Sequence, residues 1–144
     1  MILIFVGPQG SGKGTQAKII AQKLNIAHIS TGDLLRNLQG KLKQKADKIM
    51  NQGNLIPDDL MIEIIEKRIK EKDCKSGFIL DGFPRNMEQA KKLDQKLKIN
   101  KIIEISISDT EAIKRLSGRL TCKKCGAGFN SVTAPTPKQK GICD

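Results

Sequence analysis

The chain has 144 residues, 38% of them hydrophobic, a size that suits one compact globular unit rather than two independent domains. Twenty-six Lys and Arg residues against fifteen Asp and Glu residues give a formal charge of +11, which favours polyanionic partners, but the lack of Trp and Tyr argues against a dedicated single-strand nucleic-acid binder. No apolar stretch is long enough to span a membrane and no secretory leader follows Met1, so we expect a soluble, cytoplasmic protein.

Short apolar runs alternate with helical patterns through the first 117 residues. Residues 2–6 form a continuous run rich in branched side chains that ends at Gly7, which indicates a strand buried on both faces of a parallel sheet. The runs 78–80 and 102–107 have the same character. Alternating strands and helices predict an α/β fold with a parallel sheet.

Segments in which apolar residues recur at helical spacing lie between and after these runs. One helix is expected to begin near Pro57, and Ser108 with Glu111 has the spacing of a capping box that opens another. The predicted apolar stripes are Ala17, Ile20, Ala21 and Leu24; Met61, Ile65 and Ile69; Met87, Ala90, Leu93 and Leu97; and Ala112 with Leu116.

The segment GPQGSGKGT, residues 7–15, lies between the first strand and the first helix, which is the setting of a phosphate-binding loop. Glycines let backbone N–H groups point at a phosphate, the helix start adds its positive dipole end, and Lys13 supplies a mobile charge. General NTPases have Ser or Thr directly after the lysine, whereas this chain has Gly14 there and Thr15 one position later.

The string GPQGSGKGTQ, residues 7–16, resembles the loop of adenylate kinases and related nucleoside monophosphate kinases. STGDLLR at 30–36 resembles the monophosphate-binding motif of that family, and DGFPR at 81–85, followed by Gln89, resembles a second one. RLSGR at 115–119 is similar to the hinge where the family's lid begins, and the resemblance extends over essentially the whole chain.

The resemblance implies reversible phosphoryl transfer from ATP to AMP, giving two ADP, by positioning and charge neutralisation without a general base. It implies catalytic roles for Lys13, Arg85, Arg115 and Arg119, and a role for Asp81 in the water shell of Mg²⁺. The implied ATP-binding residues are Gly10, Ser11, Gly12, Lys13, Gly14, Thr15, Arg119, Gly128 and Phe129. The implied AMP-binding residues are Thr31, Arg36, Asn54, Leu55, Ile56, Gly82, Phe83, Pro84, Arg85 and Gln89. Phe129 has a second interpretation, an apolar anchor within the lid, and His28 is expected to be structural.

The same resemblance implies a P-loop NTPase-type three-layer sandwich with a parallel central sheet, a helical AMP-binding insertion and a partial Cys-rich lid. The expected segments are a core with the phosphate loop at 1–29, an AMP-binding segment at 30–56, the continued core at 57–117 and the partial lid at 118–144. We expect a monomer whose partners are ATP, AMP and ADP, with no nucleic acid and no membrane.

Three of the four cysteines cluster near the end of the chain. Cys122-x₂-Cys125, followed after seventeen residues by Cys143, matches the first three ligands of a C-x₂-C-x₁₅₋₂₀-C-x₂-C zinc site, and iron is the alternative metal. A fourth ligand would fall at position 146, so we expect the given sequence to end within the lid, with Asp144 a poor substitute ligand. Cys74 is expected to be a small buried hydrophobe.

Three other functions remain open at this stage: a pyrimidine or guanine nucleotide kinase, an inactive nucleotide-binding fragment, and a basic zinc-ribbon module that binds RNA. Thr31 and Gln89 favour AMP as the acceptor, because pyrimidine nucleotide kinases usually have Ala at the Thr31 position. The three nucleotide-site motifs argue against the RNA-binding module.

Overall fold

The computed structural model describes all residues except 53, 55, 134 and 140. Two compact units make up the chain: Met1–Val6 with Lys13–Glu104 form unit 1, and Gly7–Gly12 with Ile105–Asp144 form unit 2. The length of the chain suggested a single unit, so this division is a difference from expectation. The phosphate-loop segment passes from unit 2 to unit 1 at the peptide bond between Gly12 and Lys13.

Unit 1 contains a four-stranded parallel sheet, which confirms the predicted sheet type. Its strands are β1 (Ile2–Val6), β2 (Ala27–Ser30), β3 (Phe78–Asp81) and β4 (Lys101–Glu104), in the order β2-β3-β1-β4. The run predicted at 102–107 was wrong beyond Glu104. Glu104 lies opposite Val6, the last residue of β1, so among the described residues no strand of this sheet lies alongside the chain after that point.

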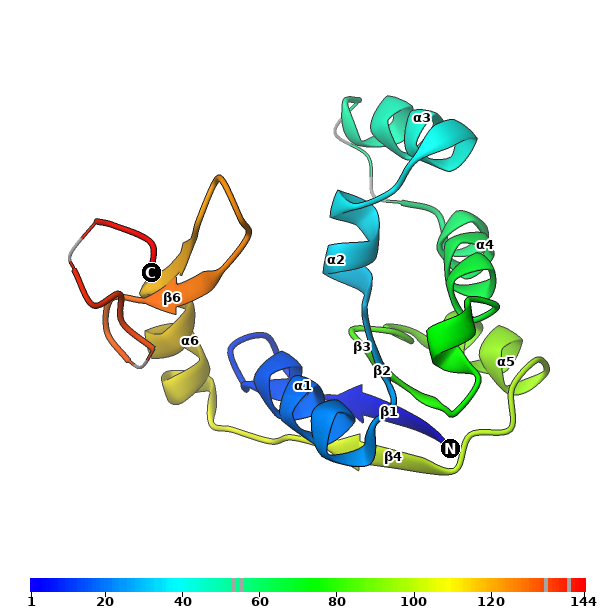
Figure 1. Cartoon of the computed structure of the whole chain (residues 1–144), viewed down its shortest axis with the longest axis horizontal. Coiled ribbons are helices and arrows are strands. Elements are labelled where there is room, and N and C mark those ends of the chain that lie inside the picture. Colours follow the sequence, from blue (N-terminus) through cyan, green and yellow to red (C-terminus); the bar gives the residue numbers. More distant parts are fainter. Residues whose placement is uncertain (53, 55, 134, 140) are drawn as a thin grey trace. The chain divides into compact units, whose positions relative to one another are not determined.

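Helices cover both faces of this sheet. Those of unit 1 are α1 (Lys13–Leu24), α2 (Thr31–Arg36), α3 (Gly40–Met50), α4 (Asp58–Arg68) and α5 (Met87–Asp94), with a short 3₁₀ helix at Lys72–Cys74. The first of them, α1, contacts β1, β2 and β3 on one face, whereas α4 and α5 pack on the other (Figure 1). Helices on two faces of a parallel sheet give the predicted three layers.

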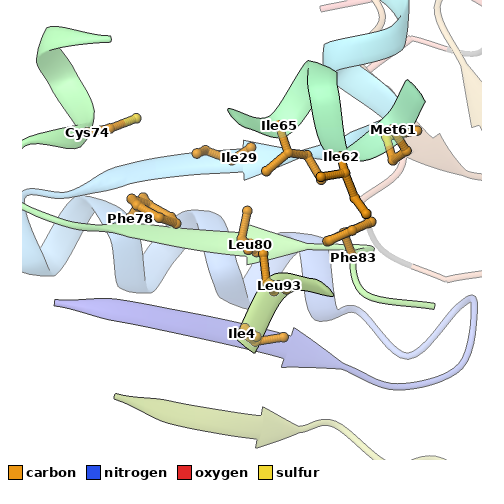
Figure 2. Packing of buried hydrophobic residues seen from close by; sticks show 10 residues of the cluster. All are labelled: Ile4, Ile29, Met61, Ile62, Ile65, Cys74, Phe78, Leu80, Phe83 and Leu93. Atoms are coloured by element: carbon orange, nitrogen blue, oxygen red, sulfur yellow. The ribbon is translucent and has the colours of Figure 1, made fainter. Parts of the chain in front are cut away.

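The main hydrophobic core lies between the sheet and α4 and α5 (Figure 2). Ile4, Ile29 and Leu80 project from three neighbouring strands toward Ile65 of α4 and Leu93 of α5. Burial of these branched and aliphatic side chains removes apolar surface from water, which is the main force that holds the layers together. The predicted core positions Met61 and Ile65 are confirmed; Leu24 and Met87 were wrong, because both lie exposed at the ends of their helices.

A clamp at the end of α4 fixes the chain reversal into β3. Arg68 donates Nη1 to Asp73 Oδ1 at 2.8 Å and Nη2 to Asp73 Oδ2 at 2.5 Å, and these bonds lower the pKa of Asp73. Cys74 is buried beside this pair, and burial raises the pKa of its thiol to about 11, which suits the inert hydrophobe that was predicted.

Unit 2 contains α6 (Asp109–Ser117) and a two-stranded antiparallel sheet of β5 (Arg119–Thr121) and β6 (Gly128–Asn130). The Ser108 part of the predicted capping box is confirmed, since Ser108 Oγ accepts the N–H of Glu111 at 3.3 Å. The other half of a capping box would join the Glu111 carboxylate to the backbone N–H of Ser108. Here that carboxylate instead accepts a hydrogen bond from Arg115 Nε at 2.7 Å. The sequence did not predict the hairpin, whose strands have three residues each.

In the part of the chain that the structure describes, no helix has both the length and the apolar character to cross a membrane.

Candidate functional site

The carboxyl ends of β2 and β3 bring Thr31 and Arg85 together. Thr31 is buried, and its Oγ1 donates to the carbonyl of Gly82 at 3.2 Å. Arg85 donates its Nε to the same carbonyl at 2.8 Å and its Nη2 to Thr31 Oγ1 at 3.3 Å. Two residues that lie 54 positions apart in sequence therefore meet where ligands bind in open α/β sheets.

Gln89 is oriented at both ends of its side-chain amide. Its Oε1 accepts the N–H of Arg85 at 2.7 Å, and its Nε2 donates to Asp58 Oδ1 at 2.6 Å. Asn86 donates to the other carboxylate oxygen of Asp58 at 2.9 Å, and these two bonds lower the pKa of Asp58. The contact between Asp58 and Gln89 spans 31 positions and leaves no local signal in the sequence.

The other predicted monophosphate residues are placed less tightly. Arg36 is exposed and paired with Asp33 at 2.6 Å, one turn away on α2. Asn54 is exposed, Ile56 and Pro84 are half-buried, and Leu55 lies outside the described residues. Phe83 is buried in the main core, so only its backbone can face a ligand.

Gly14 and Asp81 meet at the first turn of α1. A Cβ atom on Gly14 would lie 2.9 Å from Asp81 Oδ2, so the buried carboxylate occupies the space that a side chain would need. His28 reaches the same oxygen from β2, with its Nε2 at 3.5 Å. This packing explains the departure from the general pattern, because a Ser or Thr after Lys13 would collide with Asp81.

The glycines of the phosphate loop adopt backbone conformations that other residues avoid. Within unit 2, Gly7, Gly10 and Gly12 have φ angles of +142°, +81° and +85°. Ser11 is buried, and its hydroxyl has no hydrogen-bond partner among the described residues. A buried hydroxyl without a partner suits a loop that receives an anion.

Arg115 holds this loop from α6 of the same unit. Its Nη1 donates to the carbonyl of Gly10 at 3.5 Å, and its Nε donates to Glu111 at 2.7 Å, which lowers the pKa of Glu111. The other predicted ATP-side residues of unit 2 lie on the hairpin, where Arg119 and Gly128 are exposed and Phe129 is half-buried.

The three clustered cysteines come together as predicted. The sulfur atoms of Cys122, Cys125 and Cys143 all lie within 4.8 Å of one another. Backbone N–H groups of Cys125 and Lys124 lower the pKa of Cys122 to about 7, whereas sharing of its proton with the other two sulfurs raises the pKa of Cys143. Asp144 accepts the N–H of Lys138 at 2.9 Å and is not part of the cluster.

Unit 1 also contains a hollow of about 530 Å³ whose lining does not include the arginines predicted to bind a phosphate. It is lined by His28, Ser30, Asp33, Asn37 and Lys67, among others, and not by Thr31, Arg36 or Arg85. We therefore place the candidate site by the hydrogen-bonded residues at the strand ends rather than by this hollow.

The parallel sheet between two layers of helices and the glycine-rich loop directly after β1 define a P-loop α/β protein of the nucleotide-binding class. The family model for adenylate kinase matches residues 5–140. Relatives include the adenylate kinases of Ruminiclostridium cellulolyticum, Caldicellulosiruptor saccharolyticus and Archaeoglobus fulgidus, which are 49%, 47% and 45% identical over 152 aligned positions. These alignments cover 100% of this chain and 71%, 70% and 70% of the relatives. The chain belongs to the adenylate kinase family.

Proposed function

We propose that this chain carries out phosphoryl transfer from ATP to AMP, giving two ADP, and that it does so as a monomer. The observation that carries this proposal is the cluster of Thr31, Arg85 and Gln89 at the carboxyl ends of β2 and β3. The names of the relatives support the same reaction.

The AMP side is assigned to unit 1, with residues 30–56 as the binding segment. The planar guanidinium groups of Arg85 and Arg36 suit a phosphate, because each offers paired charge-assisted hydrogen bonds. Gln89, whose amide is oriented by Asp58, would read the adenine edge. Thr31 with Gly82, and the backbone of Asn54, Leu55, Ile56, Phe83 and Pro84, would complete the contacts.

The ATP side is assigned to the phosphate loop and to the lid segment 118–144. Backbone N–H groups from Gly10 to Thr15, with Lys13, would hold the phosphate tail, and the buried Ser11 hydroxyl supports this assignment. Arg115 would steady the loop through Gly10, while Arg119, Gly128 and Phe129 would meet the nucleotide from the hairpin.

These residues suffice for the chemistry without a general base. A phosphate monoester has a second pKa of about 6, so AMP is already mostly a dianion near neutral pH. The reaction then needs in-line positioning and neutralisation of charge on the transferring group, which are tasks for Lys13 and the arginines. Neither task requires the chain's single histidine.

The carboxylate of Asp81 fits a role in the water shell of Mg²⁺. Mg²⁺ prefers oxygen ligands and keeps several waters, and it supplies charge neutralisation between the phosphates when bound with ATP. Asp81 is buried beside the first turn of α1, next to Gly14 and with His28 Nε2 at 3.5 Å from its Oδ2, and this position supports the assignment.

The three thiols of Cys122, Cys125 and Cys143 fit a structural zinc ion. Zn–S bonds of about 2.3 Å in a tetrahedron place the sulfurs about 3.8 Å apart, which agrees with their mutual distances of at most 4.8 Å. Zinc bound there would close the loop between Cys125 and Cys143 and give the lid a rigid base.

An acceptor panel tests the proposed reaction. ADP formation from ATP is measured with AMP, CMP, UMP and GMP, for the chain and for Arg85→Lys, which keeps the charge and loses the planar fork. We expect AMP to be the best acceptor and Arg85→Lys to lose about tenfold or more in kcat/KM, because bonds to charged groups contribute about 1.5–3 kcal/mol. Lys91→Arg, on the exposed face of α5, serves as the control. A preference for CMP, UMP or GMP contradicts the assignment, and binding of ATP and AMP without transfer makes the chain an inactive nucleotide-binding protein.

A further inference from the structure

Asn130, the last residue of β6, is a buried polar residue that the nucleotide motifs do not account for. It is 9% exposed. Its Nδ2 donates to the carbonyl of Arg115 at 2.7 Å, and its Oδ1 accepts the N–H groups of Val132 and Thr133 at 2.8 and 2.9 Å. Both acceptor positions of the amide oxygen and one amide hydrogen are used, and a buried group satisfied in this way holds a single orientation.

Gly118 makes room for this side chain at the end of α6. A Cβ atom on Gly118 would lie 2.3 Å from Asn130 Oδ1, so no other residue fits without displacing Asn130. The carbonyl of Gly118 accepts the N–H of Ser131 at 2.7 Å and its hydroxyl at 3.2 Å. These three residues, Asn130, Gly118 and Ser131, form what we call the hinge lock, which joins the end of α6 to the end of β6.

The hinge lock acts on Arg115. Asn130 binds the carbonyl of Arg115, and the guanidinium of the same residue contacts Gly10 of the phosphate loop at 3.5 Å. Asn130 also lies opposite Arg119 in the β5–β6 register. The amide of Asn130 therefore fixes the backbone of Arg115 directly, and the backbone of Asn130 lies beside that of Arg119 in the hairpin.

We propose that Asn130 is a positioning residue that orients Arg115 and Arg119 for binding the phosphates of ATP. The inference rests on the proposed function, which assigns these arginines to the ATP side. Without the hinge lock, the end of α6 and the hairpin are free to change their relative angle. ATP binding must then order them, and the conformational entropy lost in that step weakens binding.

A change at Asn130 that keeps its shape tests the inference. Asn130→Asp retains an acceptor for Val132 and Thr133, loses the donor, and sets an anionic oxygen against the carbonyl of Arg115. We expect ATP to bind about tenfold more weakly, equivalent to about 1.4 kcal/mol, with AMP affinity within twofold of the unaltered chain. Calorimetric titration of the 144-residue chain with each nucleotide alone gives both values, so the readout does not require turnover.

The control variant is Gln95→Glu, which adds the same charge at an exposed position of unit 1 outside both proposed nucleotide sites. It is expected to bind ATP as the unaltered chain does. ATP affinity of Asn130→Asp equal to that of the control overturns the inference. So does an equal loss for ATP and AMP, because a general structural brace would weaken both nucleotides together.

A double-mutant cycle tests the inference in case Asn130→Asp folds poorly. Gly118→Ala is expected to weaken ATP binding in the unaltered chain and to have a smaller further effect in Asn130→Ala. The closest contact of the new Cβ, with Asn130 Oδ1 at 2.3 Å, is then gone, and only the contact with Val132 at 2.8 Å remains. Additive losses contradict the hinge lock. Arg115→Ala separates this inference from the proposed function. If Arg115→Ala leaves ATP affinity unchanged, the ATP-side assignment is wrong. If Arg115→Ala weakens ATP binding and Asn130→Asp does not, only the hinge lock is wrong.

Discussion

Replacing Gly14 with alanine is expected to separate stability from activity. The new Cβ would lie 2.9 Å from Asp81 Oδ2, about 0.5 Å inside the 3.4 Å at which ordinary contact begins. Asp81 is buried and has His28 Nε2 at 3.5 Å, so its carboxylate must turn away from a preferred rotamer, which costs about 0.5–1.5 kcal/mol. Alanine in place of glycine in a helix gains about 0.8–1 kcal/mol.

These two effects nearly cancel in the free energy of unfolding, whereas the displacement of Asp81 remains. We expect Gly14→Ala to lie within about 1 kcal/mol of the unaltered chain in urea unfolding. At limiting Mg²⁺, its rate of ADP formation should fall about tenfold, which corresponds to about 1.4 kcal/mol of transition-state stabilisation. Gln16→Ala, an exposed change on the same helix, serves as the control and should be unaffected in both assays.

The assay is a titration of Mg²⁺ at saturating ATP and AMP. An unchanged Mg²⁺ dependence of Gly14→Ala would refute the reasoning, because Asp81 would then have no role near the metal or would not have moved. Asp81→Asn should show the same weakened dependence, and the double variant should be little worse than either single one.

Three further changes test the core, the clamp and the cysteine cluster. Ile65→Ala should lower the free energy of unfolding by about 2–5 kcal/mol, because Ile65 is 1% exposed. The control Ile113→Ala, at a position that is 67% exposed, should change it by less than about 0.5 kcal/mol. Equal urea midpoints for the two variants would contradict the described core. Asp73→Asn should destabilise the chain at neutral pH, because a group with a lowered pKa contributes stability only while its carboxylate is charged. The difference in free energy of unfolding between the variant and the unaltered chain should shrink as pH falls through the lowered pKa of Asp73. A difference that does not change with pH would rule this out. Cys122→Ser should reduce the zinc content measured by elemental analysis, and Cys74→Ala should leave it unchanged; equal zinc in both variants would place the metal elsewhere.

Local patterns predicted the parts of the fold that depend on neighbouring residues. The run at 2–6 became β1 over the same residues, and the Ser108 cap opens α6 as its spacing indicated. Helix ends were harder to predict, because Leu24 and Met87 continue the apolar stripes in sequence although both are exposed at the ends of their helices.

Contacts between distant residues could not be predicted from spacing. Asp58 orients Gln89 across 31 positions, and Asn130 meets the carbonyl of Arg115 across 15. The motif residues were identified because their types form short strings, whereas their supporting residues have no string of their own. The collision that excludes a side chain at Gly14 likewise depends on Asp81, which comes from another strand.

The outer strand β4 has a consequence for how the chain behaves in concentrated solution. In the described sheet its far edge has no neighbouring strand, and Ile102 on it is 65% exposed. Open edges of this kind favour association between chains, and the net charge of +11 opposes it by mutual repulsion. Salt shortens the reach of that repulsion to about 10 Å at 0.1 M and about 3 Å at 1 M, so the chain should stay dispersed in dilute buffer and precipitate as salt is raised.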